Sequence, residues 1–201
     1  MPDPQTQSAG SYSHWPKTAV RIAFGTVWLV DAGLKWTTHF RSGYIDHLSE
    51  GKAGRPGWLG GWFNFWIDLQ SPHPYMWAYL VAAAETLIAV AVLVGFARKL
   101  AYTAALVLSL LIWATAEGFG GPYTGARADV DVGAGIIYAL VFGSLLAFAY
   151  YLGTSRLSAD YYLEQRIGWW HWIAEVGRRN HPTTAGTMQP RPVPRHRPSN
   201  A

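Results

Sequence analysis

Acidic and basic side chains occur in this sequence inside stretches that are otherwise apolar. Asp31 and Lys35 stand four residues apart in WLVDAGLKW, and Glu85 is the one charge in YMWAYLVAAAETLIAVAVLVGFA. The four-residue spacing puts Asp31 and Lys35 on one face of a helix, where they can form an ion pair. A charge in an apolar surrounding is costly and usually serves a function. The candidates for ligand binding or proton exchange are therefore Asp31, Lys35, Glu85, Glu117, Arg127, Asp129 and Asp131.

The composition indicates a membrane protein. Charged residues make up 14% of the 201 residues, and aromatic residues make up 15%, with 11 Trp and 11 Tyr. Soluble domains contain about 25% charged residues, and Trp and Tyr are enriched where a membrane meets water. The absence of cysteine excludes disulfides, Cys-ligated iron–sulfur clusters and Cys-type zinc sites.

Four stretches have the length that a membrane-crossing helix needs, about 20 residues. They are residues 18–38, 75–97, 100–117 and 132–153. The second and fourth are apolar on all sides, whereas helices of soluble proteins keep a polar face. The sequence predicts an all-α protein, with an integral membrane four-helix bundle in residues 18–157. The alternative is a soluble all-helical protein with buried core helices.

The order of the spans brings the charged residues to one level. If the first span runs outward, Asp31 and Lys35 lie in its outer half. Glu85 is ten residues into the second span, which is about 15 Å at 1.5 Å per residue. Glu117 then ends the third span at the outer boundary, and residues 127–131 precede the fourth. Such a group is either a polar network that fixes helix register or a site, open to the outer side, for a polar head group or a proton-exchanging ligand.

Lys and Arg residues gather on one side of the predicted bundle. They precede the first span, fill the turn at 98–99 and follow the fourth span. Because cytoplasmic flanks carry an excess of Lys and Arg, we expect a multi-pass protein of the plasma membrane with both termini cytoplasmic. Residues 1–17 and the basic tail 178–201 are predicted to be disordered. The net charge of +4 comes mainly from that tail, so no nucleic-acid partner is expected.

Two segments outside the spans are predicted to lie at membrane surfaces. Trp58, Trp62 and Trp66 repeat every four residues, which favours a short interfacial helix or re-entrant hairpin. That aromatic face is either a belt that anchors the protein at one depth or a lid over a pocket. Residues 158–177 are predicted to form one amphipathic interfacial helix on the cytoplasmic face, capped by Ser158 or Asp160. Its apolar stripe contains Leu163, Ile167, Trp170 and Ile173.

The span ends carry a pattern that resembles a known family. The matching stretches are RIAFGTVWLVDAGLKW, AETLIAVAVLVGFARKLA and WATAEGFGGPYTGARADVDVGAGIIYALVF, followed by GTSRLSADYYLEQRIG. Over residues 18–168 the chain resembles the DoxX/DoxD family of small four-span membrane proteins. DoxD is a subunit of thiosulfate:quinone oxidoreductase. The long Trp-rich outer loop and the basic tail depart from the family pattern.

The resemblance implies a membrane subunit of a quinone-linked oxidoreductase that handles a reduced sulfur compound, or of a redox-stress complex. A quinone from the bilayer is then the expected ligand, and carboxyls such as Glu85 or Glu117 exchange its protons. The chain has no flavin motif, and its histidines lie at span ends or in loops. Electrons must therefore come from membrane or soluble partner subunits. We assign no catalytic residue, no metal site and no covalently bound cofactor.

Two other classes of function remain open at this point. The main alternative is a non-enzymatic membrane scaffold or assembly subunit that recruits partner proteins through the interfacial helix, the tail and the tryptophan loop. The other is a small transporter or lipid-binding protein that uses the charged site, although four spans without an inverted repeat are not typical of transporters.

Overall fold

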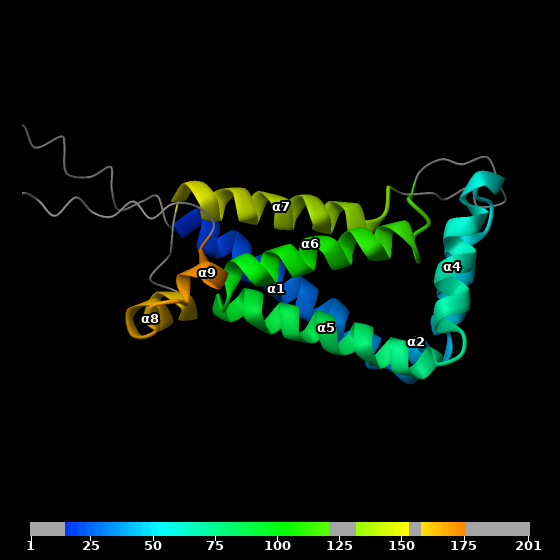
Figure 1. The fold of residues 1–201 in the computed structure, drawn as a ribbon, viewed down its shortest axis with the longest axis horizontal. Helices are drawn as coiled ribbons and strands as arrows, with labels where there is room; N and C mark the ends of the chain where they lie inside the picture. Colours follow the sequence, from blue (N-terminus) through cyan, green and yellow to red (C-terminus); the bar gives the residue numbers. More distant parts are fainter. Residues whose placement is uncertain (1–14, 121–131, 153–157, 176–201) are drawn as a thin grey trace, which may run out of the picture.

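The computed structural model describes residues 15–120, 132–152 and 158–175 of the chain. Within these ranges every regular element is a helix, which confirms the all-α prediction. Four long helices form the body of the molecule (Figure 1): α1 (Trp15–Lys35), α5 (Pro74–Val94), α6 (Arg98–Ala114) and α7 (Ala134–Leu152). Helix α1 packs along α5, α5 contacts α6, and α6 packs along α7. The long helices agree with the predicted spans to within a few residues at each end.

Helix α5 most clearly has both the length and the apolar composition of a membrane-crossing helix. It is the one helix of the described residues that is long and apolar enough to cross a membrane, and Ala134–Tyr150 of α7 is a shorter apolar helix. Helix α1 has 21 residues but contains Arg21, Asp31 and Lys35. Helix α6 ends after 17 residues, because the chain leaves the helical conformation at Thr115, with φ −111° and ψ −81°; Gly118, Phe119 and Gly120 then have positive φ angles. The third predicted span, 100–117, was therefore too long at its end.

The centre of the bundle is filled by aromatic side chains and alanines. Trp28 of α1 and Phe142 of α7 are both almost fully buried, and their rings meet edge to face with centroids 4.8 Å apart. Phe24 makes a similar contact with Phe142 at 5.3 Å. Small alanine side chains on α5 and α6 allow these helices to pack closely against the rings. Ala89 and Ala105, for example, are completely buried. This packing fixes the relative rotation of the helices that carry the charged residues.

The first outer loop folds into several short helices rather than one. They are α2 (Thr38–Ser42), α3 (Tyr44–Lys52), the 3-10 helix η2 (Gly57–Leu59) and α4 (Gly60–Gln70). Helix α4 stands across one end of the bundle (Figure 1). Helix α3 reaches the end of α6 so closely that a Cβ on Gly51 would lie 2.2 Å from the carbonyl oxygen of Thr115. The outer loop therefore closes this end of the bundle.

The sequence pattern predicted that the three tryptophans of this loop lie on one helix, but they do not. Trp58 lies in η2 and is 80% exposed. Trp62 and Trp66 lie in α4 with ring centroids 5.7 Å apart. The indole N–H of Trp62 donates to the carbonyl oxygen of Ala114 at 2.8 Å, which ties α4 to the end of α6. A belt that anchors the protein at one depth and a lid over a pocket remain the two interpretations of this aromatic face.

The prediction of one continuous amphipathic helix over 158–177 was wrong. The segment forms α8 (Ala159–Arg166) and α9 (His171–Ala174), because Ile167 is extended, with φ −123° and ψ 103°, and Gly168 follows it. Both helices lie at the end of the bundle opposite α4 (Figure 1). The predicted apolar stripe, with Leu163, Ile167 and Ile173, packs around Ala97, Trp170 and Ala174. The stripe therefore takes part in a small core at this end of the bundle.

Candidate functional site

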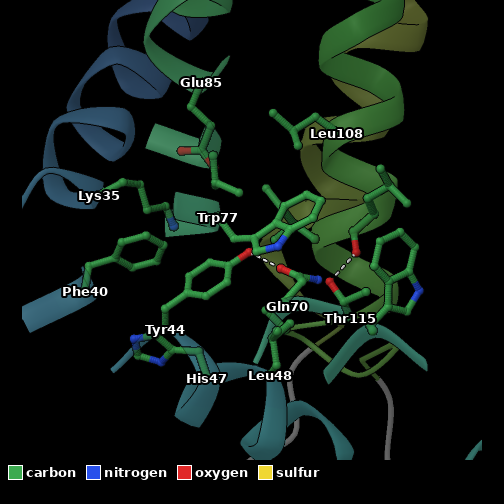
Figure 2. A pocket seen from close by; sticks show the side chains of 15 residues that line it. Lys35, Phe40, Tyr44, His47, Leu48, Gln70, Trp77, Glu85, Leu108 and Thr115 are labelled. Atoms are coloured by element: carbon green, nitrogen blue, oxygen red, sulfur yellow. Dashed lines mark hydrogen bonds between the residues drawn. The ribbon is translucent and has the colours of Figure 1, made fainter. Parts of the chain in front are cut away.

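A cavity of about 190 Å³ lies where α3 and α4 cover the end of the bundle. Its wall is mostly apolar, with Phe40, Leu48, Trp77 and Leu108 among the lining residues. The polar side chains in the wall come from five different elements: Lys35 from α1, Tyr44 and His47 from α3, Gln70 from α4, Glu85 from α5 and Thr115 just after α6. Figure 2 shows these side chains converging from opposite sides of the cavity.

Glu85 is the most unusual residue of the cavity. Its side chain is completely buried, and neither carboxylate oxygen has a hydrogen-bond partner among the described residues. In Figure 2 it points from α5 into the space that Lys35 and Trp77 also border. A buried polar group without a partner costs free energy. Such a group is therefore expected to interact with something that occupies the cavity.

Lys35 supplies the positive charge of the cavity. Its Nζ lies 3.9 Å from Asp31 Oδ2, with side-chain exposures of 21% for Lys35 and 33% for Asp31. The same ammonium lies 5.0 Å from the centre of the Phe40 ring, within the range of a cation–π contact. Among the candidates from the sequence, Asp31 and Lys35 form an ion pair. Lys35 and Glu85 both line the cavity, and Asp31 does not.

Hydrogen-bond donors complete the polar part of the wall. The Tyr44 hydroxyl donates to Gln70 Oε1 at 2.5 Å. Burial, followed by the charge of Glu85, raises the pKa of Tyr44 to about 12, so this hydroxyl keeps its proton at physiological pH. The indole N–H of Trp66 is buried and has no hydrogen-bond partner among the described residues. An acceptor atom in the cavity would find a donor on Lys35.

Sequence reasoning did not identify Tyr44, Gln70, Trp66 or Trp77 as site residues. One signal was available in the sequence, because Tyr44 and Leu48 stand four apart in the mostly polar helix YIDHLSEGK. That spacing marks one apolar face of a helix, and this face turns toward the cavity. The contact with Gln70, 26 residues away, had no such signal.

Glu117 belongs to a different part of the structure. Its carboxylate accepts the backbone N–H of Gly135 at 2.9 and 3.1 Å, so it caps the start of α7. The turn that holds it is clamped by Arg55, which donates to the carbonyl oxygens of Glu117 and Gly120, both at 3.1 Å. A carboxylate at a helix N-terminus is well placed by the helix dipole. Glu117 therefore has a structural contact of its own and does not line the cavity.

Three sequence candidates, Arg127, Asp129 and Asp131, lie outside the described residues. No group of three or more His, Cys, Asp or Glu side chains that could hold a metal ion occurs in residues 15–120, 132–152 or 158–175.

A second cluster of buried charges, at the opposite end of the bundle, was not predicted. Asp160 is completely buried, and its carboxylate accepts four hydrogen bonds. The donors are Ala97 N at 2.7 Å, Arg98 N at 3.0 Å, Arg98 Nε at 2.9 Å and Trp170 Nε1 at 2.9 Å. The sequence suggested that Asp160 caps its own helix. It caps α6 instead, because Ala97 has a left-handed φ of 46° and α6 has no local side-chain cap.

Glu164 lies beside this cluster. Its Oε1 is 3.8 Å from Arg98 Nη2. Burial raises the pKa of Glu164 to about 7; the neighbouring Glu175 carboxyl adds to the increase, and Arg98 opposes it. With Asp160 satisfied by four donors, the cluster holds the C-terminal segment to the bundle. Its geometry supports a structural latch rather than a ligand site.

One known family covers the part of the chain that forms the outer cavity. The family model for DoxX matches residues 17–118, just over half of the chain. This range includes every residue that lines the cavity. A search of curated proteins and a search of solved structures found no match.

Proposed function

The chain belongs to the DoxX family, a family of membrane proteins, and on that premise we propose that it is an integral membrane subunit that binds a quinone headgroup in the outer cavity. It associates with a quinone-linked oxidoreductase, either one that oxidises a reduced sulfur compound or a redox-stress complex. The observation that carries the ligand proposal is Glu85, a fully buried carboxyl without a hydrogen-bond partner in the described residues.

The outer faces of the long helices support membrane embedding. Large apolar side chains are exposed on α1, α5, α6 and α7, far more than water would favour. On a soluble protein these faces would need a partner, whereas acyl chains cover them in a bilayer. Examples are Val30 at 64%, Leu34 at 60%, Leu87 at 71%, Val107 at 50% and Leu140 at 66% exposed.

The Lys and Arg distribution supports a plasma-membrane topology with both termini cytoplasmic. Arg98 and Lys99 then mark the cytoplasmic end of the bundle, which also carries α8 and α9. The cavity with Lys35 and Glu85 lies toward the outer side under α3 and α4. Residues 18–157 form the membrane domain in this proposal, and residues 158–177 remain at the cytoplasmic boundary as the latched segment.

The cavity has the chemistry that a quinone ring needs. Aromatic walls from Phe40, Trp66 and Trp77 suit a flat apolar ring. The carbonyl oxygens of a quinone are acceptors, which match the ammonium donor of Lys35. Reduction of a quinone to a quinol takes two electrons and two protons, and Glu85 is placed to pass protons to a ring oxygen. The electrons come from a partner subunit, since the sequence offers no redox motif of its own.

The test is the quinone content of protein purified in native lipid. We expect Leu108→Phe, which fills the cavity from α6, to lower bound quinone by more than about tenfold, equivalent to about 1.4 kcal/mol. Glu85→Gln should lower it by a similar factor, because the ring oxygen loses the carboxyl group that donates a proton to it. The matched control is Leu87→Phe, which adds the same ring at a position that is 71% exposed.

Two results would contradict this proposal. Wild-type protein that carries no quinone after gentle extraction would remove the ligand. Equal loss in Leu87→Phe and Leu108→Phe would show that the cavity is not where the quinone binds.

A non-enzymatic scaffold is the second candidate function. The observation that favours it is the exposure of Tyr162 at 63% and Trp169 at 61% on the latched C-terminal segment. Such side chains are enriched in protein interfaces. A partner protein that co-purifies with the wild type and is lost in Tyr162→Ser combined with Trp169→Ser, while quinone content stays unchanged, would favour the scaffold.

A further inference from the structure

An apolar groove of about 380 Å³ lies on the surface between α5 and α6. It is distinct from the outer cavity, with no lining residue in common. We propose that this groove holds an acyl chain of an acidic phospholipid whose phosphate group binds Lys99. The proposal rests on the membrane embedding proposed above, but not on the quinone assignment.

The shape of the groove follows from the sizes of the side chains that line it. Ala91, Ala101 and Ala104 provide little bulk beyond their backbone, whereas Leu87 and Leu100 stand out beside them, 71% and 58% exposed. Every lining residue is apolar. The α5 part runs from Leu87 to Val94, which is about 10 Å along the helix axis. A hollow whose lining residues are all apolar suits a hydrocarbon chain.

A basic residue, Lys99, lies in the sequence between the groove-lining residues Ala97 and Leu100. Lys99 follows Arg98 in the first turn of α6 and precedes Leu100, which lines the groove. Its ammonium donates to the carbonyl oxygen of Trp172 at 3.3 Å. An ammonium has three donors, so a phosphate can share this group. Arg98 is already engaged by Asp160 at 2.9 Å, which leaves Lys99 as the natural partner for an anion here.

The latched C-terminal segment contacts the same part of the groove. The Phe96 ring lines the groove and lies 5.1 Å from the Trp170 ring, and Ala97 also packs against Trp170. Trp172 is 70% exposed, as is typical of aromatic residues at the level of lipid headgroups. Asp160 thus positions the floor of the groove and the carbonyl group that orients Lys99.

Charge favours a lipid over a second copy of the chain as the occupant. A symmetric pair that faced each other across this groove would bring the two Lys99 side chains toward one another. Like charges placed together disfavour such an interface. An acidic phospholipid instead supplies an anion to Lys99 and a hydrocarbon chain to the groove, and basic residues on the cytoplasmic side attract such lipids.

The test is native mass spectrometry of the full chain released from vesicles with equal amounts of phosphatidylglycerol and phosphatidylcholine. We expect the wild type to retain phosphatidylglycerol with a preference of at least fivefold. Lys99→Gln should bring the ratio close to one, because the phosphate loses its cation. Ala104→Phe and, separately, Leu100→Trp should reduce retention of both lipids by filling or reshaping the groove.

Matched controls separate the groove from general effects. Lys52→Gln removes the same charge from α3, where Lys52 donates to Asn64 at 2.6 Å, and it should keep the preference. Leu80→Phe adds bulk to an exposed part of α5 outside the groove and should keep the retention. Leu108→Phe, which tests the quinone site, should leave lipid retention unchanged, so the two proposals can fail independently.

Several results would overturn the proposal. These are no preference in the wild type, the same effect from Lys52→Gln as from Lys99→Gln, or a lipid-free dimer as the main species. Thermal unfolding of each variant in the same vesicles shows whether it is folded. If one groove variant is unfolded, the other decides the result.

Discussion

Two buried carboxyl groups show how the same chemistry serves opposite purposes. Asp160 and Glu85 are both completely buried. Asp160 has four donors within 3.0 Å, which is what a buried carboxylate needs to be stable. Glu85 has none among the described residues. The hydrogen bonds of Asp160 therefore stabilise the fold, whereas Glu85 is the carboxyl group that we propose interacts with a ligand.

Removing the charge of Asp160 should destabilise the protein strongly. In Asp160→Asn one acceptor oxygen becomes an NH2 group that faces other donors, and Arg98 loses its ion-pair partner at 2.9 Å. Breaking a buried pair in this way costs about 3 kcal/mol. We expect a clear fall in the free energy of unfolding, together with faster proteolysis between α7 and α8, both measured on protein in nanodiscs.

Asp46→Asn is the matched control, since Asp46 is an exposed residue of α3. It should change neither stability nor proteolysis measurably. Similar unfolding for the two variants would show that the hydrogen bonds of Asp160 do not hold the segment in place.

At the scale of elements, helix ends in this protein are capped from a distance. Helix α5 is the exception, because Gly95 ends it locally in a left-handed conformation, with φ 67°. A Cβ on Gly95 would lie 2.0 Å from Arg21 Nη1. Asp160 caps α6 from 62 residues away, and Glu117 caps α7 from 18 residues away. These long-range caps join the helices into one structure, so α8 and α9 depend on the bundle for their position.

Attachment of α8 should depend on pH through Glu164. The pKa of Glu164 in the folded protein is raised to about 7, above its ordinary value in an unfolded chain, so the folded state binds the proton more tightly. Its contribution to stability is therefore present below about pH 4.5 and is lost as the pH rises toward 7. We expect the wild-type unfolding temperature to fall by a few degrees between pH 5 and pH 8.

Glu164→Gln mimics the protonated side chain and should flatten this pH dependence, with its largest stabilising effect at pH 8. Glu50→Gln, which removes a charge from the exposed surface of α3, serves as the control and should leave the slope unchanged. An unchanged slope in Glu164→Gln would rule out Glu164 as its source.

At the scale of the whole molecule, the two ends of the bundle are built differently. One end holds Lys35 and Glu85 around a cavity under α3 and α4, and the other holds Arg98 and Asp160 in a closed cluster under α8 and α9. The asymmetry agrees with the proposed orientation, in which the ligand site opens toward the outer side and the latch faces the cytoplasm.

The orientation can be tested cleanly because the chain has no cysteine. Trp58 is 80% exposed in the outer loop, and Tyr162 is 63% exposed on α8, so single cysteines there should be reactive. We expect Trp58→Cys to react with a membrane-impermeant maleimide in intact cells. Tyr162→Cys should react only after permeabilisation. The reverse pattern, or labelling of both cysteines in intact cells, would contradict the proposed topology.

Sequence alone determined the helical nature of the chain, the approximate limits of its four long helices and its family. Hydropathy and helical periodicity are local properties, so a window of about 20 residues is enough to read them. The same local reading identified Lys35 and Glu85 as charges in apolar surroundings. It also predicted one helix face for Trp58, Trp62 and Trp66, of which Trp62 and Trp66 share α4.

Only the tertiary structure decided which side chains meet. Local pattern gave no sign that Tyr44 would donate to Gln70, 26 residues away, or that Asp160 would serve α6, 62 and 63 residues away. It also could not show that Glu117 is used as the cap of α7, or that the stripe of 158–177 is buried by Ala97 and its neighbours. The physical reason is that such partners depend on how helices rotate and stack. That arrangement is set by packing around Trp28 and Phe142, which involves the whole bundle at once.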